Sequence, residues 1–269
     1  MEALLDLNFE RGTMRTTLRS LAVFFFATIL PVQPEARAQG KVKVMSDGPL
    51  RPALVQIAEA FRQESGNQIE FVFGTSPVVH KKVADGETAD VLIIQPNFVA
   101  ELMKSGKVIA GDHPVAGRVG LGLGARADAP ARDISTTEAF KQALLNADSL
   151  IFNNVASGNY FAKVLERLGI GEAVKSKVVR AEPAVVFERV IQGKGNDIGV
   201  GTIPLINVTK GLRLIGPLPP EVQSYIVYTA APMSTAQSPQ GAKAFIAFLG
   251  SSAAKSLLAA NGVESGAAK

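Results

Sequence analysis

The chain has no cysteine and no tryptophan, and only two of its 269 residues are histidines. Without cysteine it has no disulfide, no thiol nucleophile and no thiolate metal site, and only His80 and His113 could offer imidazole to a metal. The sequence also lacks basic blocks interleaved with aromatic residues, which nucleic-acid-binding proteins use. We therefore expect no metal, no cofactor and no nucleic-acid partner.

Long apolar runs are also missing from the rest of the chain after the N-terminal region. No run there approaches the ~18 residues of a membrane span. Near the N-terminus, a short apolar run at 21–32 follows two arginines and precedes Ala36-Arg37-Ala38. This pattern is typical of a secretory signal peptide, here residues 1–38, and predicts a periplasmic protein. Acidic residues before Met14 are unusual in such a signal, so we expect translation to start at Met14.

The net charge is mildly positive and evenly distributed. The whole chain carries +4, and residues 1–38 contain four basic and four acidic residues, so the 231 residues that remain (269 − 38) keep the same charge. A positive overall field attracts anions. The positive charge therefore favours a small anionic ligand as partner.

Short β-rich apolar runs alternate with helical periods along the rest of the chain, which predicts an α/β protein with helices covering parallel sheets. The alternation restarts after 118–124, which predicts a second lobe at 118–225. We expect the first lobe to comprise 41–117 plus 226–263, because a long strand predicted at 222–231 would return the chain to it. Two crossing segments would then form a hinge, and 264–269 would be a disordered tail.

Three predicted strand-to-helix junctions are rich in small and hydroxyl-bearing residues, namely 42–49, 71–77 and 150–160. The first free N–H groups of a helix carry partial positive charge and bind anions. Since ligands of α/β folds bind at the carboxyl ends of strands, we expect one anion-binding cleft between the lobes.

Structural roles are open for several of these residues. Ser76 and Ser157 are typical helix N-caps, and Asp47 could cap its own helix through Gly48. His80 stands beside two lysines, a setting typical of solvated histidines, and Tyr160 could cover a helix–sheet seam.

The chain resembles periplasmic solute-binding proteins of the molybdate-binding type, the extracytoplasmic components of ABC transporters. The residues that carry the resemblance span most of 41–263, and they are Ser46-Asp47-Gly48, Phe73-Gly74-Thr75-Ser76, Ala89-Asp90-Val91, Ala156-Ser157-Gly158-Asn159-Tyr160 and Gly193 to Gly199. The resemblance implies a type 2 periplasmic binding fold whose two lobes close on an anion. It also implies an inner-membrane permease as partner, and we expect the protein to be a monomer.

The resemblance implies a set of ligand contacts at the junctions. The expected ligand-binding residues are Ser46, Asp47, Gly48, Arg51, Thr75, Ser76, Ala156, Ser157, Gly158, Tyr160, Pro183 and Thr202. Three of them depart from the molybdate-binding pattern: Asp47 would repel a dianion, Pro183 has no N–H to donate, and Thr202 replaces a tyrosine.

At three places the chain is more similar to the periplasmic aconitate isomerase branch of this fold than to the molybdate-binding type. These places are Ala156-Ser157-Gly158-Asn159-Tyr160, Ala181-Glu182-Pro183 and 217–223. That resemblance implies a tricarboxylate ligand and a proton shift without a cofactor. His80 is then the candidate base, with Arg51, Lys81 and Lys82 as cations for the carboxylates. The first reading is a binding protein without a catalytic residue, and the isomerase is the alternative.

Overall fold

The computed structural model describes residues 40–266, so the predicted signal peptide and the last residues of the predicted tail lie outside the described residues. The strands are β1 Lys41–Asp47, β2 Gln68–Gly74, β3 Val91–Ile94, β4 Val115–Arg126, β5 Ser149–Asn153, β6 Val178–Ala181, β7 Asp197–Thr202, β8 Leu212–Pro217 and β9 Tyr225–Pro232. The helices are α1 Arg51–Ser65, α2 Ser76–Ala84, α3 Pro96–Lys104, α4 Thr137–Leu145, α5 Ala156–Arg167, α6 Gly171–Val174, α7 Val186–Gln192, α8 Ile203–Val208, α9 Pro239–Leu249 and α10 Ser252–Ala260. Short 3-10 helices include η1 Gly48–Leu50 and η3 Pro183–Val185.

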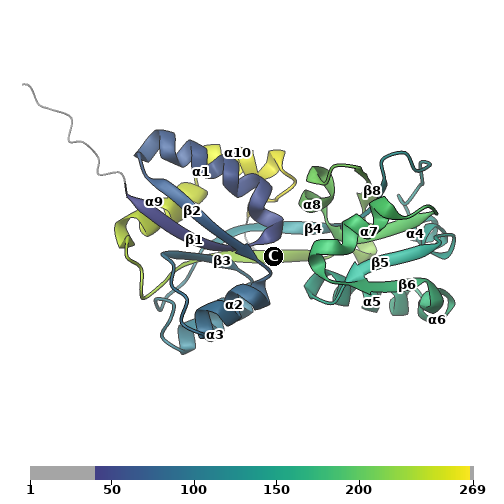
Figure 1. The fold of residues 1–269 in the computed structure, drawn as a ribbon, viewed down its shortest axis with the longest axis horizontal. Coiled ribbons are helices and arrows are strands. Elements are labelled where there is room, and N and C mark those ends of the chain that lie inside the picture. The colour runs from purple at the N-terminus through teal and green to yellow at the C-terminus, as the bar shows by residue number, and fades with distance from the viewer. Residues whose placement is uncertain (1–39, 267–269) are drawn as a thin grey trace, which may run out of the picture. The chain divides into compact units, whose positions relative to one another are not determined.

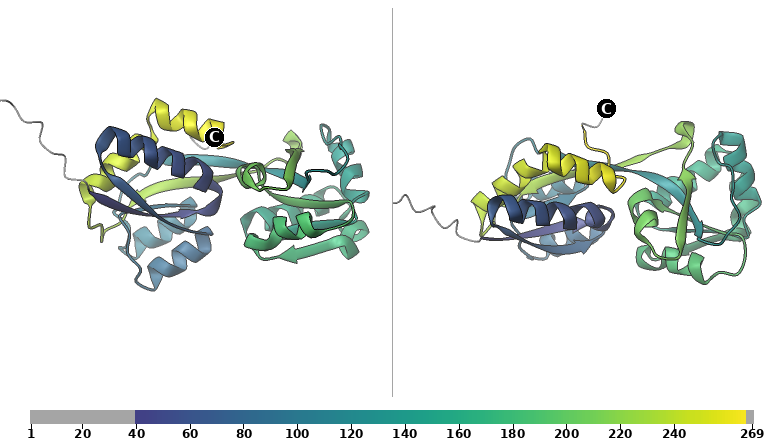
Figure 2. Two further views of the ribbon diagram at one scale, coloured as in Figure 1. Left: turned by 45° about the horizontal axis from the view of Figure 1, so that its top comes forward. Right: turned by 90° about the horizontal axis from the view of Figure 1, so that it is seen from above.

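Two long strands, β4 and β9, connect the two lobes. The strand order is β2-β1-β3-β9-β4-β7-β5-β6, with β8 paired to β4. The first half of β4 pairs with β9 as far as Gly120, and from Leu121 onwards it pairs with β7 and then also with β8. Figure 2 shows β4 in teal and β9 in light green running from one lobe to the other. These two strands are the two-segment hinge that the sequence predicts.

Each lobe has helices on both faces of its half of the sheet. In the first lobe, α1, α9 and α10 cover one face and α2 and α3 the other (Figure 1). The ring of Phe61 on α1 lies 5.3 Å from that of Phe245 and 5.4 Å from that of Phe248, both on α9. Burying each such ring contributes about 1.5–3 kcal/mol. In the second lobe, α4, α5 and α6 share one core and α7 packs into another.

The strand directions place the carboxyl ends of the parallel strands of both lobes at the hinge. The first-lobe strands β1, β2 and β3 are mutually parallel, and β3 is antiparallel to β9. In the second lobe β5, β6 and β7 are parallel, and β7 is antiparallel to β4. Because β4 and β9 are themselves antiparallel, the carboxyl ends of both sets of strands point toward the hinge. The predicted fold class, a two-lobed α/β protein with mainly parallel sheets, is confirmed.

The C-terminal helices α9 and α10 close the first lobe. Ala242 and Phe245 of α9 and Leu258 of α10 are buried in the same core as α1. Within residues 40–266, no single helix is long and apolar enough to cross a membrane; α9 and α10 reach that length and composition only as a pair bent by 65°.

Two predicted boundaries were wrong. The long strand predicted from Val222 starts at Tyr225, because the residues before it form a 3-10 turn that opens with a proline. Glu264 was placed in a disordered tail, yet its backbone pairs with that of Arg118 in both directions at 2.9 Å.

Candidate functional site

The first-lobe junctions are organised by a buried carboxylate, that of Asp47. Its Oδ1 accepts from the N–H of Gly48 at 2.8 Å, and its Oδ2 accepts from the N–H of Ser76 at 2.9 Å and from the Ser76 hydroxyl at 2.5 Å. The same hydroxyl accepts from the N–H of Gln95 at 3.1 Å, which ties in the end of β3. The buried hydroxyl of Ser46 donates to the carbonyl of Asp47. The structure thus brings together Ser46, Asp47, Gly48 and Ser76, all four predicted to bind ligand.

The Asp47 carboxylate occupies the position at the N-terminus of α2 where the sequence predicts an anionic ligand. We call such an anion-binding helix N-terminus an anion seat. The predicted N-cap role of Ser76 was wrong, because Thr75 is the N-cap of α2 and Ser76 is its first helical residue. Asp47 does cap η1, as one of the two open readings had it, but it also occupies the N-terminus of α2. Burial raises the pKa of Asp47, against the lowering effect of its hydrogen bonds to Ser76 and Gly48.

A cation stands beside this seat. Arg51 begins α1 directly after η1, and its guanidinium carbon lies 4.5 Å from the ring centroid of Phe73. Phe73 in turn stacks on Phe71. The Arg51 guanidinium forms no hydrogen bond or ion pair with any other residue of the part of the chain that the structure describes, so its five N–H donors remain available to an anion. Thr75, at the end of β2, is half-buried next to the same strand ends.

The second-lobe junction is organised by the side chain of Asn153 at the end of β5. Its Oδ1 accepts from the N–H of Val155 and from that of Gly158, both at 3.1 Å, and its Nδ2 donates to the Ser157 hydroxyl at 3.0 Å. A Cβ at position 158 would lie 1.8 Å from the carbonyl oxygen of Asn153, so glycine is required by this close approach. The predicted cap role of Ser157 was wrong, since Val155 is the N-cap of α5.

Asn153 leaves part of the α5 N-terminus free. The N–H groups of Ala156 and Ser157 have no hydrogen-bond partner among residues 40–266, because the Asn153 side chain takes only those of Val155 and Gly158. Helix dipole and unpaired donors together favour an anion at this position. Ala156, Ser157 and Gly158 therefore form one group with the geometry of an anion seat.

Thr202 ends β7 with a buried hydroxyl that has no hydrogen-bond partner within the described chain. An unpaired buried hydroxyl costs about 1–3 kcal/mol, so it is expected to meet water or a ligand. The helix that follows, α8, contacts η1 and α1 of the first lobe. Thr202 directly precedes α8, and Gly48 begins η1. Since α8 contacts η1, the two residues lie next to elements that touch across the hinge.

Other predicted site residues have structural partners. The hydroxyl of Tyr160 lies 3.1 Å from the carbonyl of Val222 and 3.2 Å from that of Gln223, and it accepts from Arg167. Tyr160 therefore fastens α5 to the segment that leads into the hinge strand β9. Pro183 begins η3 at the carboxyl end of β6, so it lies at the expected edge of the sheet.

His80 is one turn into α2, where its Nε2 lies 3.1 Å from a carboxylate oxygen of Glu101 on α3 and its ring packs near Phe98. The structure thus couples His80 to the α2–α3 surface rather than to the Asp47 or Asn153 groups. Among the described residues, no group of three or more His, Asp or Glu side chains could hold a metal ion.

Sequence reasoning missed three residues near the junctions: Asn153, Arg180 and Tyr228. Arg180, next to last in β6, donates to the Asn153 carbonyl at 2.6 Å and lies 4.3 Å from the ring centroid of Phe152. The Tyr228 hydroxyl has no partner within residues 40–266, and burial and then the charge of Asp47 raise its pKa well above the usual value. The position of Asn153 directly after a buried strand was a usable signal; β-strand alternation alone does not distinguish Tyr228 from other core residues.

With this geometry in place, comparison with known proteins shows the family. The profile described as "Bacterial extracellular solute-binding protein" matches residues 42–264. The chain belongs to this family of solute-binding proteins.

Individual relatives refine the comparison. An aconitate isomerase from a Pseudomonas species is 26% identical over 229 residues, covering 82% of this chain and 86% of the relative. The molybdate-binding protein ModA of Haemophilus influenzae is 23% identical over 239 residues, covering 84% and 90%. The solved periplasmic molybdate-binding protein of Azotobacter vinelandii superposes with a TM-score of 0.71 at 17% identity, covering 84% of this chain and 100% of that one. These matches confirm the resemblance to both branches that the sequence motifs indicated.

Proposed function

We propose that the protein is an exported binding component of an ABC transporter whose two lobes close on a small organic carboxylate. The observation that carries the proposal is the pairing of a free anion seat on α5 with a free cation, Arg51, at the facing strand ends. A ligand that contacts both lobes stabilises the closed form, because only differential affinity shifts such an equilibrium.

The occupied seat on α2 favours a carboxylate over a compact oxyanion. A tetrahedral dianion held between α2 and α5 would meet the Asp47 carboxylate where donors are needed. At ~4 Å and an effective dielectric constant of about 20, each pair of like unit charges costs about 4 kcal/mol. An elongated polycarboxylate can avoid this cost by placing one carboxylate on the α5 seat and another on Arg51.

The proposed contacts follow from the available donors. The N–H groups of Ala156 and Ser157 and the hydroxyl of Thr202 would bind from the second lobe, with Arg180 as a nearby cation. From the first lobe, the contacts are Arg51 and the protonated hydroxyl of Tyr228. Asp47, Ser76 and Gly158 then serve to shape the site.

Export and transport complete the proposal. The family description, extracellular solute-binding protein, agrees with a periplasmic location after removal of residues 1–38. In this role the closed monomer delivers its ligand to a permease in the inner membrane. N-terminal sequencing of the exported protein tests the cleavage after Ala38, and a start at Met14 can be tested by replacing that codon.

The test is calorimetric titration of residues 39–269 with cis-aconitate, trans-aconitate, citrate, molybdate, tungstate and sulfate. We expect the tricarboxylates to bind and Arg51→Gln to weaken them by more than tenfold, the loss of a charged hydrogen bond worth about 1.5–3 kcal/mol. Arg62→Gln is the matched control, because Arg62 lies on the same helix in an exposed pair with Glu59. Tight binding of molybdate with no effect of Arg51→Gln would refute the carboxylate assignment.

A second candidate is an isomerase of small tricarboxylates on the same scaffold. It is favoured by the 26% identity to an aconitate isomerase along most of both chains. His80 is the candidate base, and its pairing with Glu101 would have to be exchanged for contact with the ligand. Proton NMR of cis- and trans-aconitate incubated with the protein decides the matter: interconversion that His80→Gln abolishes would establish the enzyme, and its absence would leave the binding protein.

A further inference from the structure

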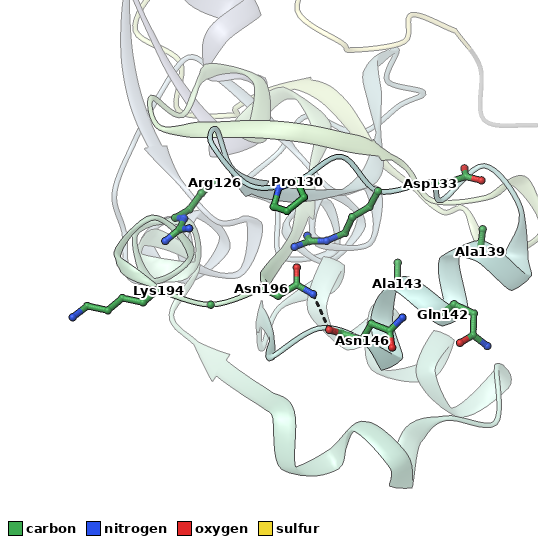
Figure 3. A pocket seen from close by; sticks show the side chains of 11 residues that line it. Arg126, Pro130, Asp133, Ala139, Gln142, Ala143, Asn146, Lys194 and Asn196 are labelled. Carbon is green, nitrogen blue, oxygen red and sulfur yellow. Dashed lines mark hydrogen bonds between the residues drawn. The ribbon is translucent and has the colours of Figure 1, made fainter.

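The second lobe contains a cavity of about 690 Å³ away from the site described above. It is open to solvent on one side and is lined by the end of β4 and the loop after it, by α4, and by the turn at 194–196 that precedes β7 (Figure 3). β5 and β7 begin at this end and run toward the hinge. The cavity therefore lies at the opposite end of the half-sheet from Ser157 and Thr202.

Most of the arginines around this cavity already have partners. Arg126 pairs with Asp128 through Nε and donates through Nη1 to the carbonyl of Gly193. Arg213 donates through Nη2 to the carbonyls of Ala129 and Pro130, while its buried Nε has no hydrogen-bond partner among residues 40–266. These bonds hold the loop that forms one wall of the cavity.

Arg132 in the same wall is different, because its Nη1 and Nη2 are both buried and have no hydrogen-bond partner among residues 40–266. Buried guanidinium groups without an acceptor are rare, since charged groups lose their hydration on burial. Lys194 on the facing turn is exposed and forms no ion pair within the same residues. Two cations without partners thus line one cavity.

Each carboxylate near Arg132 accepts a hydrogen bond from another group through one of its oxygens. Asp148 Oδ2 accepts from the N–H of Asn196 at 2.6 Å, and Asp197 Oδ1 accepts from the Ser149 hydroxyl. Asp133 at the rim accepts from the N–H of Ser135 at 2.8 Å. Burial and the positive charge of Arg213 lower the pKa of Arg132, while Asp148 and Asp197 act against this. No group of residues 40–266 accepts a hydrogen bond from the two Nη groups of Arg132.

We propose that this cavity is a second binding site, for a small organic carboxylate. A guanidinium can hold a carboxylate through two parallel hydrogen bonds, and Nη1 and Nη2 of Arg132 are the free pair. Lys194 at the mouth adds a second positive charge. The volume lies within the range of about 300–1,000 Å³ of small-molecule sites. This site is independent of the ligand bound between the lobes.

The experiment is titration of ¹⁵N-labelled protein (residues 39–269) with succinate, and separately with inorganic phosphate, followed by amide chemical shifts. We expect saturable shifts at Gly195 and Asn196 with succinate and weaker ones with phosphate. Arg132→Gln should reduce the affinity measured at these amides by about tenfold or more, as loss of a charged bidentate contact requires. Lys194→Gln, at an exposed position, should reduce it severalfold without affecting the fold.

Lys175→Gln is the matched control, because Lys175 is an exposed cation of the same lobe paired with Glu172. It should leave the shifts at Gly195 and Asn196 unchanged. The proposal is overturned by shifts confined to Ala156 and Ser157, by saturation that prefers phosphate, or by equal affinity in Arg132→Gln, Lys194→Gln and the control.

Discussion

Replacing Asp47 by Asn tests the inference that this carboxylate occupies the N-terminus of α2. Asn keeps the size of the side chain but replaces one acceptor oxygen by an NH₂ group. In the structure the two oxygens accept from Gly48 N–H, Ser76 N–H and the Ser76 hydroxyl. In either orientation of the amide, at least one buried N–H then faces a donor.

The expected loss of unfolding free energy follows from the number of buried donors that lose their acceptor. One or two orphaned buried donors cost about 1–3 kcal/mol each, and relief from burying a charge offsets part of the loss. We expect Asp47→Asn to lower the free energy of unfolding at neutral pH by about 2–3 kcal/mol. Urea unfolding followed by circular dichroism measures it, with Asp85→Asn as control, because Asp85 lies in an exposed pair with Lys81 at the other end of α2.

The pH dependence provides a second measurement with a definite sign. The pKa of Asp47 is raised in the folded protein, so the folded state holds its proton more tightly than the unfolded chain does. The contribution of Asp47 to stability is therefore greatest below 3.8, the usual pKa of an aspartate, and is lost as pH rises through the pKa of the folded state. The difference in unfolding free energy, wild type minus Asp47→Asn, should fall over this window.

The variant should also change anion preference. With the charge of Asp47 gone, molybdate or sulfate would no longer be repelled by about 4 kcal/mol, and their affinity should rise by tenfold or more. An Asp47→Asn variant as stable as the wild type, a stability difference that rises with pH, or an unchanged oxyanion affinity would each contradict the assignment of the Asp47 carboxylate to the N-terminus of α2.

Three further substitutions test the second lobe. Gly158→Ala should destabilise the protein by about 2 kcal/mol or more and weaken the ligand, because its Cβ would meet the Asn153 carbonyl at 1.8 Å; urea unfolding and calorimetry report both. Tyr160→Phe should cost about 1 kcal/mol in unfolding free energy and change ligand affinity by less than about threefold, since its hydroxyl is bonded to hinge carbonyls. Thr202→Val removes an unpaired buried hydroxyl, so it should leave thermal stability unchanged or raised while weakening the ligand by about 1 kcal/mol, and equal affinity would exclude Thr202 from the site.

The fold was predictable from the sequence because its periodic segments are long and clearly bounded. Pro77 and Gly66, for example, stand at the start and end of helices where their backbone preferences are satisfied. The short elements α6, α8 and β8 were missed, since a few residues carry no periodic signal and their stability comes from packing.

The positions of the strand-to-helix junctions were predictable from the sequence, but the hydrogen bonds that their side chains form were not. Junction residues such as Ser157 were correctly brought to the facing strand ends, because parallel strands place their carboxyl ends at one edge. Which donors remain free to bind a ligand depends on hydrogen bonds between residues far apart in the sequence. Asp47 and Ser76 are separated by 29 residues, and Tyr160 and Val222 by 62. Such pairings depend on tertiary register, so local pattern could not separate a ligand contact from an internal cap.

These internal hydrogen bonds at the helix N-termini explain how one fold can bind different anions. Helix N-termini at the hinge offer generic donors, and the chain can leave a seat open or fill it with its own carboxylate. Here the Asn153 side-chain amide accepts from only part of the N–H groups at the start of α5, whereas the Asp47 carboxylate occupies the N-terminus of α2. Under the proposed function, a ligand is bound at one end by amide donors of the second lobe and at the other by the Arg51 guanidinium. We propose that this asymmetry selects an extended anion with separated charges, because a compact anion would reach only one of the two positions and gain too little from closing the lobes.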